Sequence, residues 1–185
     1  MRSAARFELL ILWILWAYPF LFRAPKFQKR SSITVYKPTT IGLLLELLGM
    51  FMVWFFQVPG APRASVLVLT AALIVGVLAV ILMWTAIPQL GRQFRIYAGL
   101  YGDHQLVRTG PYAVVRHPIY ASLLAMTLST GLVLARWPWL LAALALSIAG
   151  TEIRVGVEDR LLASRFGAEF SAYRKSTPAY LPFVR

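Results

Sequence analysis

The sequence predicts an all-α integral membrane protein with about five transmembrane helices. Hydrophobic residues make up 59% of its 185 residues, whereas soluble proteins contain roughly 45–50%. The mean hydropathy is +0.67. The apolar residues form blocks that are nearly free of charge, rather than the periodic stripes of soluble helices and strands. The hydrocarbon core of a membrane is therefore the main environment that the sequence predicts.

Five blocks approach the roughly 17–25 residues that a helix needs to cross a bilayer. They are residues 7–22, 40–58, 65–87, 118–135 and 137–155. The first block is the shortest, and Arg6 and Arg23 at its ends have side chains long enough to reach the interfaces. A cleavable signal peptide is the alternative for this block, because Arg2 and Arg6 precede it. No clear small-x-small cleavage site follows it, however.

The distribution of basic residues predicts the direction in which the chain crosses. Lys and Arg resist translocation and remain on the cytosolic side. Fifteen of the nineteen Lys and Arg residues fall within 23–37, 92–116 and 154–185, and the other four lie on the opposite side of the five spans. This places the N-terminus outside and the C-terminus in the cytosol, and we expect a prokaryotic inner (plasma) membrane. The long polar segments 88–117 and 156–185 then face the cytosol, where we expect the active site.

The formal net charge of +12 favours an anionic partner. Because the basic residues lie between and beside the apolar blocks, anionic membrane lipids are the expected partners, and nucleic acid is not. The absence of cysteine excludes disulfides, a catalytic thiolate, Cys-ligated zinc and iron–sulfur clusters. Two histidines are too few for most His-based metal sites, so no metal is expected. The oligomeric state is not predicted.

The densest group of polar and aromatic residues leads directly into the fourth apolar block. It reads HQLVRTGPYAVVRHPIY, from His104 to Tyr120. Gly110 and Pro111 indicate a turn, and Pro118 suits the first position of a helix. The N-terminus of that helix favours a negative ligand group, such as the carboxylate of an amino-acid-like cofactor. The alternative is a juxtamembrane loop whose side chains contact lipid headgroups.

A second polar group, from Thr151 to Leu162, lies at the cytosolic end of the fifth block. Arg154 and Glu158 are four residues apart and share one helix face, so they can pair or line a pocket together. Burial of Arg154 requires a partner, and its guanidinium is shaped to bind a carboxylate. Glu46 is the one charged residue of the second block. It is a candidate for function, or for an ion pair that only fixes helix packing.

These motifs resemble those of the isoprenylcysteine carboxyl methyltransferases and their bacterial and archaeal relatives, and more distantly those of phospholipid N-methyltransferases. The resemblance covers roughly the last 80 residues. It consists of HxLVxxGPYxxxRHPxY at 104–120, an acidic pair at Glu158 and Asp159, and FGxEFxxYRKxTPxYLPF at 166–183. The ordered series is specific, whereas RHP alone is weak. Two residues depart from the pattern: Asp159 replaces the usual glutamate, and Tyr97 stands near an expected polar cofactor contact.

The resemblance implies a membrane methyltransferase that uses S-adenosyl-L-methionine. It implies that the cofactor pocket is formed by His104, Gln105, Leu106, Val107, Tyr112, His117, Pro118, Ile119, Tyr120 and Glu158. Arg154 looks like the family's substrate-contacting arginine and is the expected catalytic residue. Glu46 joins Arg154 as an expected substrate contact. The first three blocks match only in hydrophobicity, so the resemblance does not identify the substrate.

Methyl transfer from a sulfonium has an already activated leaving group, so the enzyme mainly aligns donor and acceptor and excludes water. The hypothesis is O-methylation of a carboxylate that Arg154 holds, on a lipophilic or lipidated acceptor. An amine acceptor would instead require Glu158 or another group to accept a proton.

Three alternatives remain open: a phospholipid N-methyltransferase, an NADPH-dependent membrane reductase, and a non-catalytic lipid-binding membrane protein. We expect one membrane domain, 1–185, with three spans in 1–90 and a cofactor-binding catalytic region in 91–185.

Overall fold

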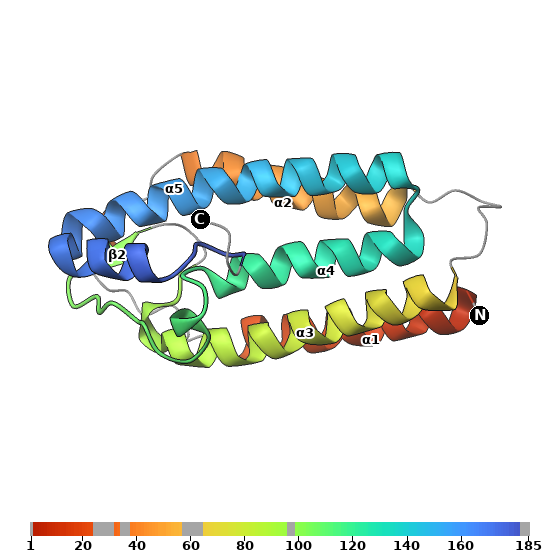
Figure 1. The fold of residues 1–185 in the computed structure, drawn as a ribbon, viewed down its shortest axis with the longest axis horizontal. Coiled ribbons are helices and arrows are strands. Elements are labelled where there is room, and N and C mark those ends of the chain that lie inside the picture. The colour runs from red at the N-terminus through yellow and green to blue at the C-terminus, as the bar shows by residue number, and fades with distance from the viewer. Residues whose placement is uncertain (1, 24–31, 34–37, 57–64, 96–98, 182–185) are drawn as a thin grey trace.

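The computed structural model describes residues 2–23, 32–33, 38–56, 65–95 and 99–181. Five long helices lie side by side along one axis (Figure 1). They are α1 (Arg2–Tyr18), α2 (Pro38–Phe55), α3 (Val66–Leu90), α4 (Pro118–Leu134) and α5 (Trp137–Ser176). Short segments complete the fold: the π-helical η1 (Pro19–Arg23), the 3-10 turns η2 (Gly91–Gln93) and η3 (Gly110–Ala113), and the strands β1 (Ser32–Ile33) and β2 (Leu100–Tyr101), which pair antiparallel.

Four of the five expected spans are long and apolar enough to cross a membrane. In the described part of the chain these are Ala5–Arg23, Pro38–Phe55, Val66–Gln93 and Trp137–Ser176. The remaining span, α4, is apolar but has only 17 residues. The helices alternate in direction, so that the segment before α4 and the end of α5 lie at one end of the bundle (Figure 1). Which end faces the cytosol stays a prediction.

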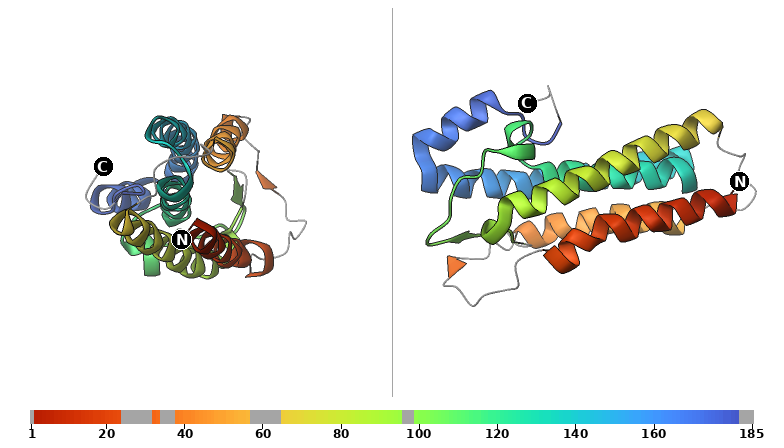
Figure 2. Two further views of the ribbon diagram at one scale, coloured as in Figure 1. Left: turned by 90° about the vertical axis from the view of Figure 1, so that its right-hand side faces the viewer. Right: turned by 90° about the horizontal axis from the view of Figure 1, so that it is seen from below.

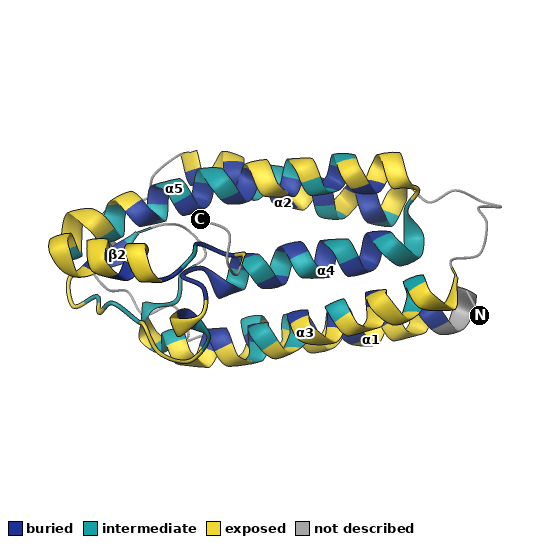
Figure 3. Cartoon of the chain, viewed as in Figure 1, coloured by how far each residue is buried: buried dark blue, intermediate teal, exposed yellow. Residues whose placement is uncertain are grey.

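Helix α4 is enclosed by the other helices, and none of its residues is exposed (Figure 3). It carries hydroxyl side chains that would be unfavourable against lipid, but each finds a partner inside the bundle. The Ser122 hydroxyl donates to the carbonyl of Ala79 on α3 at 2.7 Å and accepts from the Trp16 indole of α1, also at 2.7 Å. Ser129 donates to the carbonyl of Ala72 at 2.7 Å. These bonds hold α1 and α3 against α4.

Helices α2 and α5 pack closely because small residues meet along their contact. A Cβ on Gly42 would lie 2.7 Å from the carbonyl oxygen of Gly150, and one on Gly150 would lie 2.4 Å from that of Gly42. Two helical turns after Gly42, Gly49 lies directly against the side chain of Ser147, which leaves no room for a Cβ. The backbones are therefore close enough for short polar side chains to bridge the two helices.

Helix α5 extends well beyond the expected span, 137–155, and reaches Ser176. At Gly167 the backbone adopts φ 51° and ψ −118°, which only glycine adopts readily, and the chain changes direction (Figure 2). Residues 177–181, which we name the C-terminal strap, follow the helix. The strap accepts hydrogen bonds from the backbone N–H groups of Arg116 and His117 through the carbonyls of Pro178 and Ala179, both at 2.8 Å.

Replacing Gly150 with Ala tests the close contact between α2 and α5. The added methyl group overlaps the α2 backbone, so we expect a loss of about 1–3 kcal/mol in stability. Gly156→Ala is the matched control, because no atom lies within 4 Å of a Cβ at that position of the same helix. Thermal unfolding in detergent should show a lower midpoint for Gly150→Ala alone. Equal midpoints for the two variants would contradict the close contact.

Candidate functional site

A cavity of about 400 Å³ lies between the helices, near the start of α4. All five helices contribute to its lining. The twelve residues that the sequence predicts for cofactor or substrate all line this one cavity: Glu46, His104, Gln105, Leu106, Val107, Tyr112, His117, Pro118, Ile119, Tyr120, Arg154 and Glu158. The structure therefore brings together residues from α2, from the segment before α4, and from α4 and α5. What each residue binds stays a prediction.

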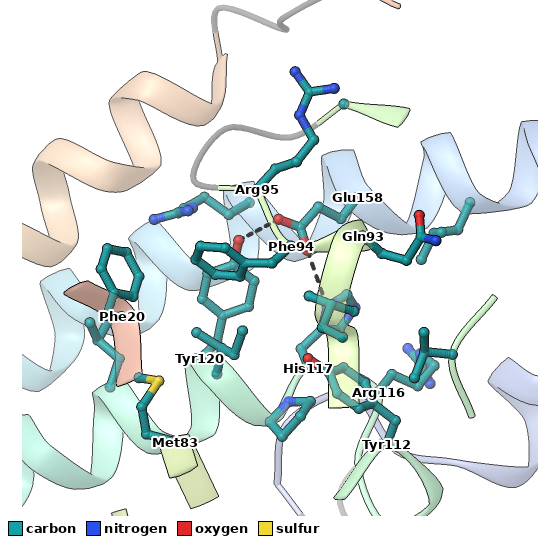
Figure 4. A pocket seen from close by; sticks show the side chains of 18 of the residues that line it. Phe20, Met83, Gln93, Phe94, Arg95, Tyr112, Arg116, His117, Tyr120 and Glu158 are labelled. Atoms are coloured by element: carbon teal, nitrogen blue, oxygen red, sulfur yellow. Dashed lines mark hydrogen bonds and ion pairs between the residues drawn. The ribbon is translucent and has the colours of Figure 1, made fainter. Parts of the chain in front are cut away.

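His117 lies between two neighbouring carboxylates of α5. Its Nδ1 is 3.3 Å from Glu158 Oε2, and its Nε2 is 2.8 Å from Asp159 Oδ1. Glu158 also accepts a hydrogen bond of 2.5 Å from the Tyr120 hydroxyl, so it lies between His117 and Tyr120 (Figure 4). Because His117 immediately precedes α4 and Tyr120 lies in its first turn, these contacts fasten the beginning of α4 to α5.

Asp159 is buried and makes more contacts than the sequence indicated. Its Oδ2 accepts a hydrogen bond of 3.0 Å from Arg116 Nη2, while Oδ1 faces His117. Arg116 also donates to the carbonyls of Arg174 and Thr177 at the end of α5. The shorter aspartate therefore still pairs with two cations, and its pairing joins the segment before α4 to the C-terminal strap.

The carboxylates decide the protonation of His117. Burial by itself lowers the pKa of this imidazole, but hydrogen bonds to Asp159 and Glu158 outweigh burial and raise the pKa from 6.5 to about 8. At neutral pH the imidazole is therefore protonated and donates from both nitrogens. Protonation stabilises the fold fully below about pH 6.5, and this stabilisation is lost as the pH rises through about 8.

Arg154 is held by Glu46 of the neighbouring helix. Arg154 Nη1 lies 2.6 Å from Glu46 Oε2, and the Thr151 hydroxyl donates to Glu46 Oε1 at 3.0 Å. The guanidinium carbon lies 4.9 Å from the centre of the Tyr120 ring, a cation–π contact. The Glu46 side chain is 1% exposed, yet both it and Arg154 line the cavity. The ion pair that the sequence left as an alternative is therefore present, and it faces the site.

The segment before α4 brings polar atoms to the cavity that have no hydrogen-bond partner among the described residues. Among them are His104 Nδ1 and the Tyr112 hydroxyl oxygen. Burial, followed by the charge of Arg95, lowers the pKa of His104 to about 4, so its imidazole is neutral at pH 7. The backbone carbonyl of Tyr112 accepts from the Tyr173 hydroxyl at 2.5 Å, which fixes η3 against α5. Buried polar atoms without partners indicate a place for a polar ligand.

The opposite part of the cavity is apolar. We name as the apolar wall Trp16, Phe20, Leu43, Leu47, Met50, Met83 and Leu123. These residues come from α1, η1, α2, α3 and α4. Phe20 and Met83 lie on one side of the view in Figure 4, and Tyr112 and Arg116 lie on the other. The cavity thus has a polar part and an apolar part, with Tyr120 between Met83 and Glu158 in this view.

Comparison with known proteins agrees with this arrangement of motifs. The model of the isoprenylcysteine carboxyl methyltransferase (ICMT) family matches residues 71–164. The chain belongs to this family. Because the described residues also include four helices that are long and apolar enough to cross a membrane, the chain is an integral membrane protein. The ICMT match contains eleven of the twelve predicted site residues, and Glu46 lies outside it.

Three curated relatives match about half of this chain. Protein-S-isoprenylcysteine O-methyltransferase of Schizosaccharomyces pombe is 33% identical over 103 residues, which cover 54% of this chain and 43% of the relative. Protein-S-isoprenylcysteine O-methyltransferase B of Arabidopsis thaliana is 30% identical over 113 residues, covering 58% and 56%. Cobalt-zinc-cadmium resistance protein CzcN of Cupriavidus metallidurans is 37% identical over 95 residues, covering 48% and 42%. The match spans about half the length of these relatives.

Sequence reasoning missed several residues of this ICMT-family cavity. Gln93 of η2 and the next two residues, Phe94 and Arg95, line it. The available signal was that polar residues appear directly after the third apolar block, on the side of the membrane where the other site residues were expected. Tyr97, which departs from the expected family pattern, lies outside the described residues. In the described part of the chain, no group of three or more His, Cys, Asp or Glu side chains could hold a metal ion.

Titration of the two histidines tests the charge cluster directly, because the chain contains only His104 and His117. NMR of protein labelled at histidine should give one midpoint near pH 8, from His117, and one near pH 4, from His104. Asp159→Asn should lower the first midpoint, because it removes a hydrogen-bonded carboxylate, and leave the second unchanged. Two midpoints between about pH 6 and 7, the ordinary range for histidine, would contradict the cluster.

Proposed function

We propose that this protein is an S-adenosylmethionine-dependent methyltransferase that O-methylates a carboxylate on a lipophilic acceptor. The observation that carries the proposal is the single cavity in which all twelve predicted residues meet, with polar and apolar parts. Membership of the ICMT family supports the activity. Two relatives named as isoprenylcysteine O-methyltransferases support a lipidated acceptor. The excess of basic residues at the site's end of the bundle supports a cytosolic site in a prokaryotic inner membrane.

The residues of the polar part fit S-adenosylmethionine. The cavity of about 400 Å³ falls in the roughly 300–1,000 Å³ typical of sites for small organic molecules. His104 Nδ1 and the Tyr112 hydroxyl offer hydrogen bonds that no described residue uses. The carboxylate of Glu158 can accept hydrogen bonds from hydroxyl or ammonium groups. We propose that the segment from His104 to Val107, with Tyr112, the first turn of α4 and Glu158, holds the cofactor.

The apolar wall and Arg154 fit the acceptor. The wall can bury a hydrocarbon chain, which would leave its polar end near the guanidinium of Arg154. An arginine is well suited to hold a carboxylate through two parallel hydrogen bonds. Since a lipophilic acceptor is dissolved in the bilayer, we propose that it enters from the membrane side and the cofactor from the cytosol.

Catalysis in this proposal consists of alignment and exclusion of water. Bound S-adenosylmethionine supplies a methyl group on a positively charged sulfur, which is already a good leaving group. Arg154 orients the acceptor carboxylate, and the Tyr120 ring packs against the guanidinium and limits its movement. No general base is required, because a carboxylate is ionised at neutral pH. The C-terminal strap covers the start of α4 and helps to keep water out.

Transfer of a radioactive methyl group tests the activity. Purified protein, labelled S-adenosylmethionine and N-acetyl-S-farnesylcysteine should give a labelled methyl ester, and a lipid extract should reveal the native acceptor. Arg154→Lys should reduce kcat/KM about tenfold or more, because lysine cannot make the paired hydrogen bonds of arginine. It keeps a positive charge beside Glu46, whereas Arg154→Ala would bury an unpaired carboxylate. Arg160→Lys, on the exposed face of the same helix, should have no effect.

Absence of label from every acid acceptor and from the lipid extract would contradict the proposed function. Reduction of a lipid with NADPH by the same preparation would support the alternative of a membrane reductase instead. Full activity of Arg154→Lys would remove the proposed role of Arg154 but would leave the methyl transfer itself in place.

A pair of tyrosine variants tests the proposed cofactor site without turnover. Tyr112→Phe removes a buried hydroxyl that has no partner, so stability without ligand should stay equal or rise, while the Kd for S-adenosylmethionine should increase roughly threefold to tenfold. Tyr173→Phe removes a hydroxyl that binds the Tyr112 carbonyl, so it should lower stability. Calorimetric titration and thermal unfolding measure the two effects. Unchanged cofactor affinity in Tyr112→Phe would contradict the assignment.

A further inference from the structure

Glu46 is a carboxylate that the protein itself brings to the guanidinium proposed to bind the acceptor. It lies inside α2, two turns after Pro38, is buried, and lies 2.6 Å from Arg154. It also lines the cavity and lies outside the matched family region. An acceptor carboxylate that reaches Arg154 therefore meets a guanidinium that already has a negative partner.

The contact between α2 and α5 makes this pairing part of the fold. Gly42 lies one turn before Glu46, and its missing side chain leaves room for the Arg154 stem, since a Cβ there would lie 2.6 Å from Arg154 Cγ. Gly150 lies one turn before Arg154 and leaves room for the α2 backbone. Thr151 holds the second carboxylate oxygen of Glu46. The side chain of Glu46 is therefore fixed at the guanidinium.

The charge of the acceptor changes during the proposed reaction. A carboxylate oxygen forms a bond to the methyl carbon, the bond from that carbon to sulfur breaks, and the sulfur keeps the electron pair. No proton is released. The acceptor thus changes from an anion to a neutral ester, which no longer pairs with Arg154. A buried guanidinium requires a partner in every state of the cycle.

We infer that Glu46 is a resident counterion for Arg154 and thereby a specificity-determining residue, an inference that rests on the proposed function. Glu46 neutralises Arg154 before the acid binds and after the ester has formed. When an acid is bound, Glu46 competes with it for the guanidinium and repels it. The protein therefore binds the acid acceptor less tightly than Arg154 alone would allow, while the affinity for the neutral ester is unaffected by Glu46.

Equilibrium binding of an acid and its ester tests this inference without any methyl donor. The probes are N-acetyl-S-farnesylcysteine and its methyl ester, each titrated into full-length protein in nanodiscs at pH 7. Glu46→Gln keeps the size of the side chain and an oxygen that accepts from Arg154, but removes the charge. The ratio of the two dissociation constants, ester over acid, should rise about tenfold or more, because a close like charge has been removed. The Kd of the ester should stay within about twofold.

Two further variants complete the experiment. Glu46→Asp keeps the charge but withdraws it from Arg154, so the ratio should rise in the same direction by less; this variant decides the question if Glu46→Gln does not fold. Glu169→Gln is the control for loss of one negative charge, since Glu169 is half exposed and pairs with Arg108 away from the cavity. Its ratio should equal that of the unaltered protein.

An unchanged or lower ratio in the Glu46 variants would overturn the inference. An unchanged ratio would show that the ion pair only joins α2 to α5, and a lower one would show that Glu46 helps to hold the acid. If the unaltered protein binds neither probe, the proposed acceptor class fails, and the inference fails with it. If acid and ester bind as expected but no labelled ester forms with S-adenosylmethionine, only the proposed activity fails.

Discussion

The start of α4 and the middle of α5 are held together by buried opposite charges, and the site depends on this contact. Of two consecutive carboxylates, Asp159 is buried and Glu158 is partly buried, which is unfavourable unless cations and donors replace the lost hydration. His117 faces both, Arg116 pairs with Asp159, and Tyr120 donates to Glu158. Because these partners are nearly consecutive in sequence, one contact fixes the whole segment that leads into α4. This contact therefore fixes the position of the cavity-lining residues that precede α4.

The same contact joins the start of α4 to the C-terminal strap. The C-terminal strap accepts backbone hydrogen bonds from Arg116 and His117, the two residues whose side chains neutralise Asp159. Charge pairing and backbone pairing with the strap are therefore properties of one segment. Burial also strengthens the charge pairing, because opposite charges attract more strongly where water is excluded.

The helices could be predicted from sequence, because a charge-free block long enough to cross a bilayer forms few structures other than a membrane-spanning helix. The start of α4 at Pro118 and the shared face of Arg154 and Glu158 followed from local rules. The enclosure of α4 by the other helices did not follow from local rules, because helices that face lipid and helices that face protein are both apolar. The serine and threonine content of α4 was the available signal. The pairing of Glu46 with Arg154 was left open, because a lone buried carboxylate in one helix does not identify its partner in another. Family motifs found much of the polar part of the cavity, but neither the apolar wall nor Gln93 and Arg95, which follow α3.

The cavity is built from two parts of the chain with different relationships to the family. The polar part lies within the matched region, residues 71–164, whereas α1 and α2, which contribute most of the apolar wall, precede it. In the proposed function, the hydrocarbon part of the acceptor can therefore vary through α1 and α2 while the reacting end stays the same. Glu46 is the exception, because it belongs to α2 but contacts Arg154 in the matched region. A change in α2 that displaces this carboxylate would alter the charge at the reacting end as well as the shape of the apolar part. In the proposed function, recognition of acceptor shape and of acceptor charge is thus coupled through one side chain.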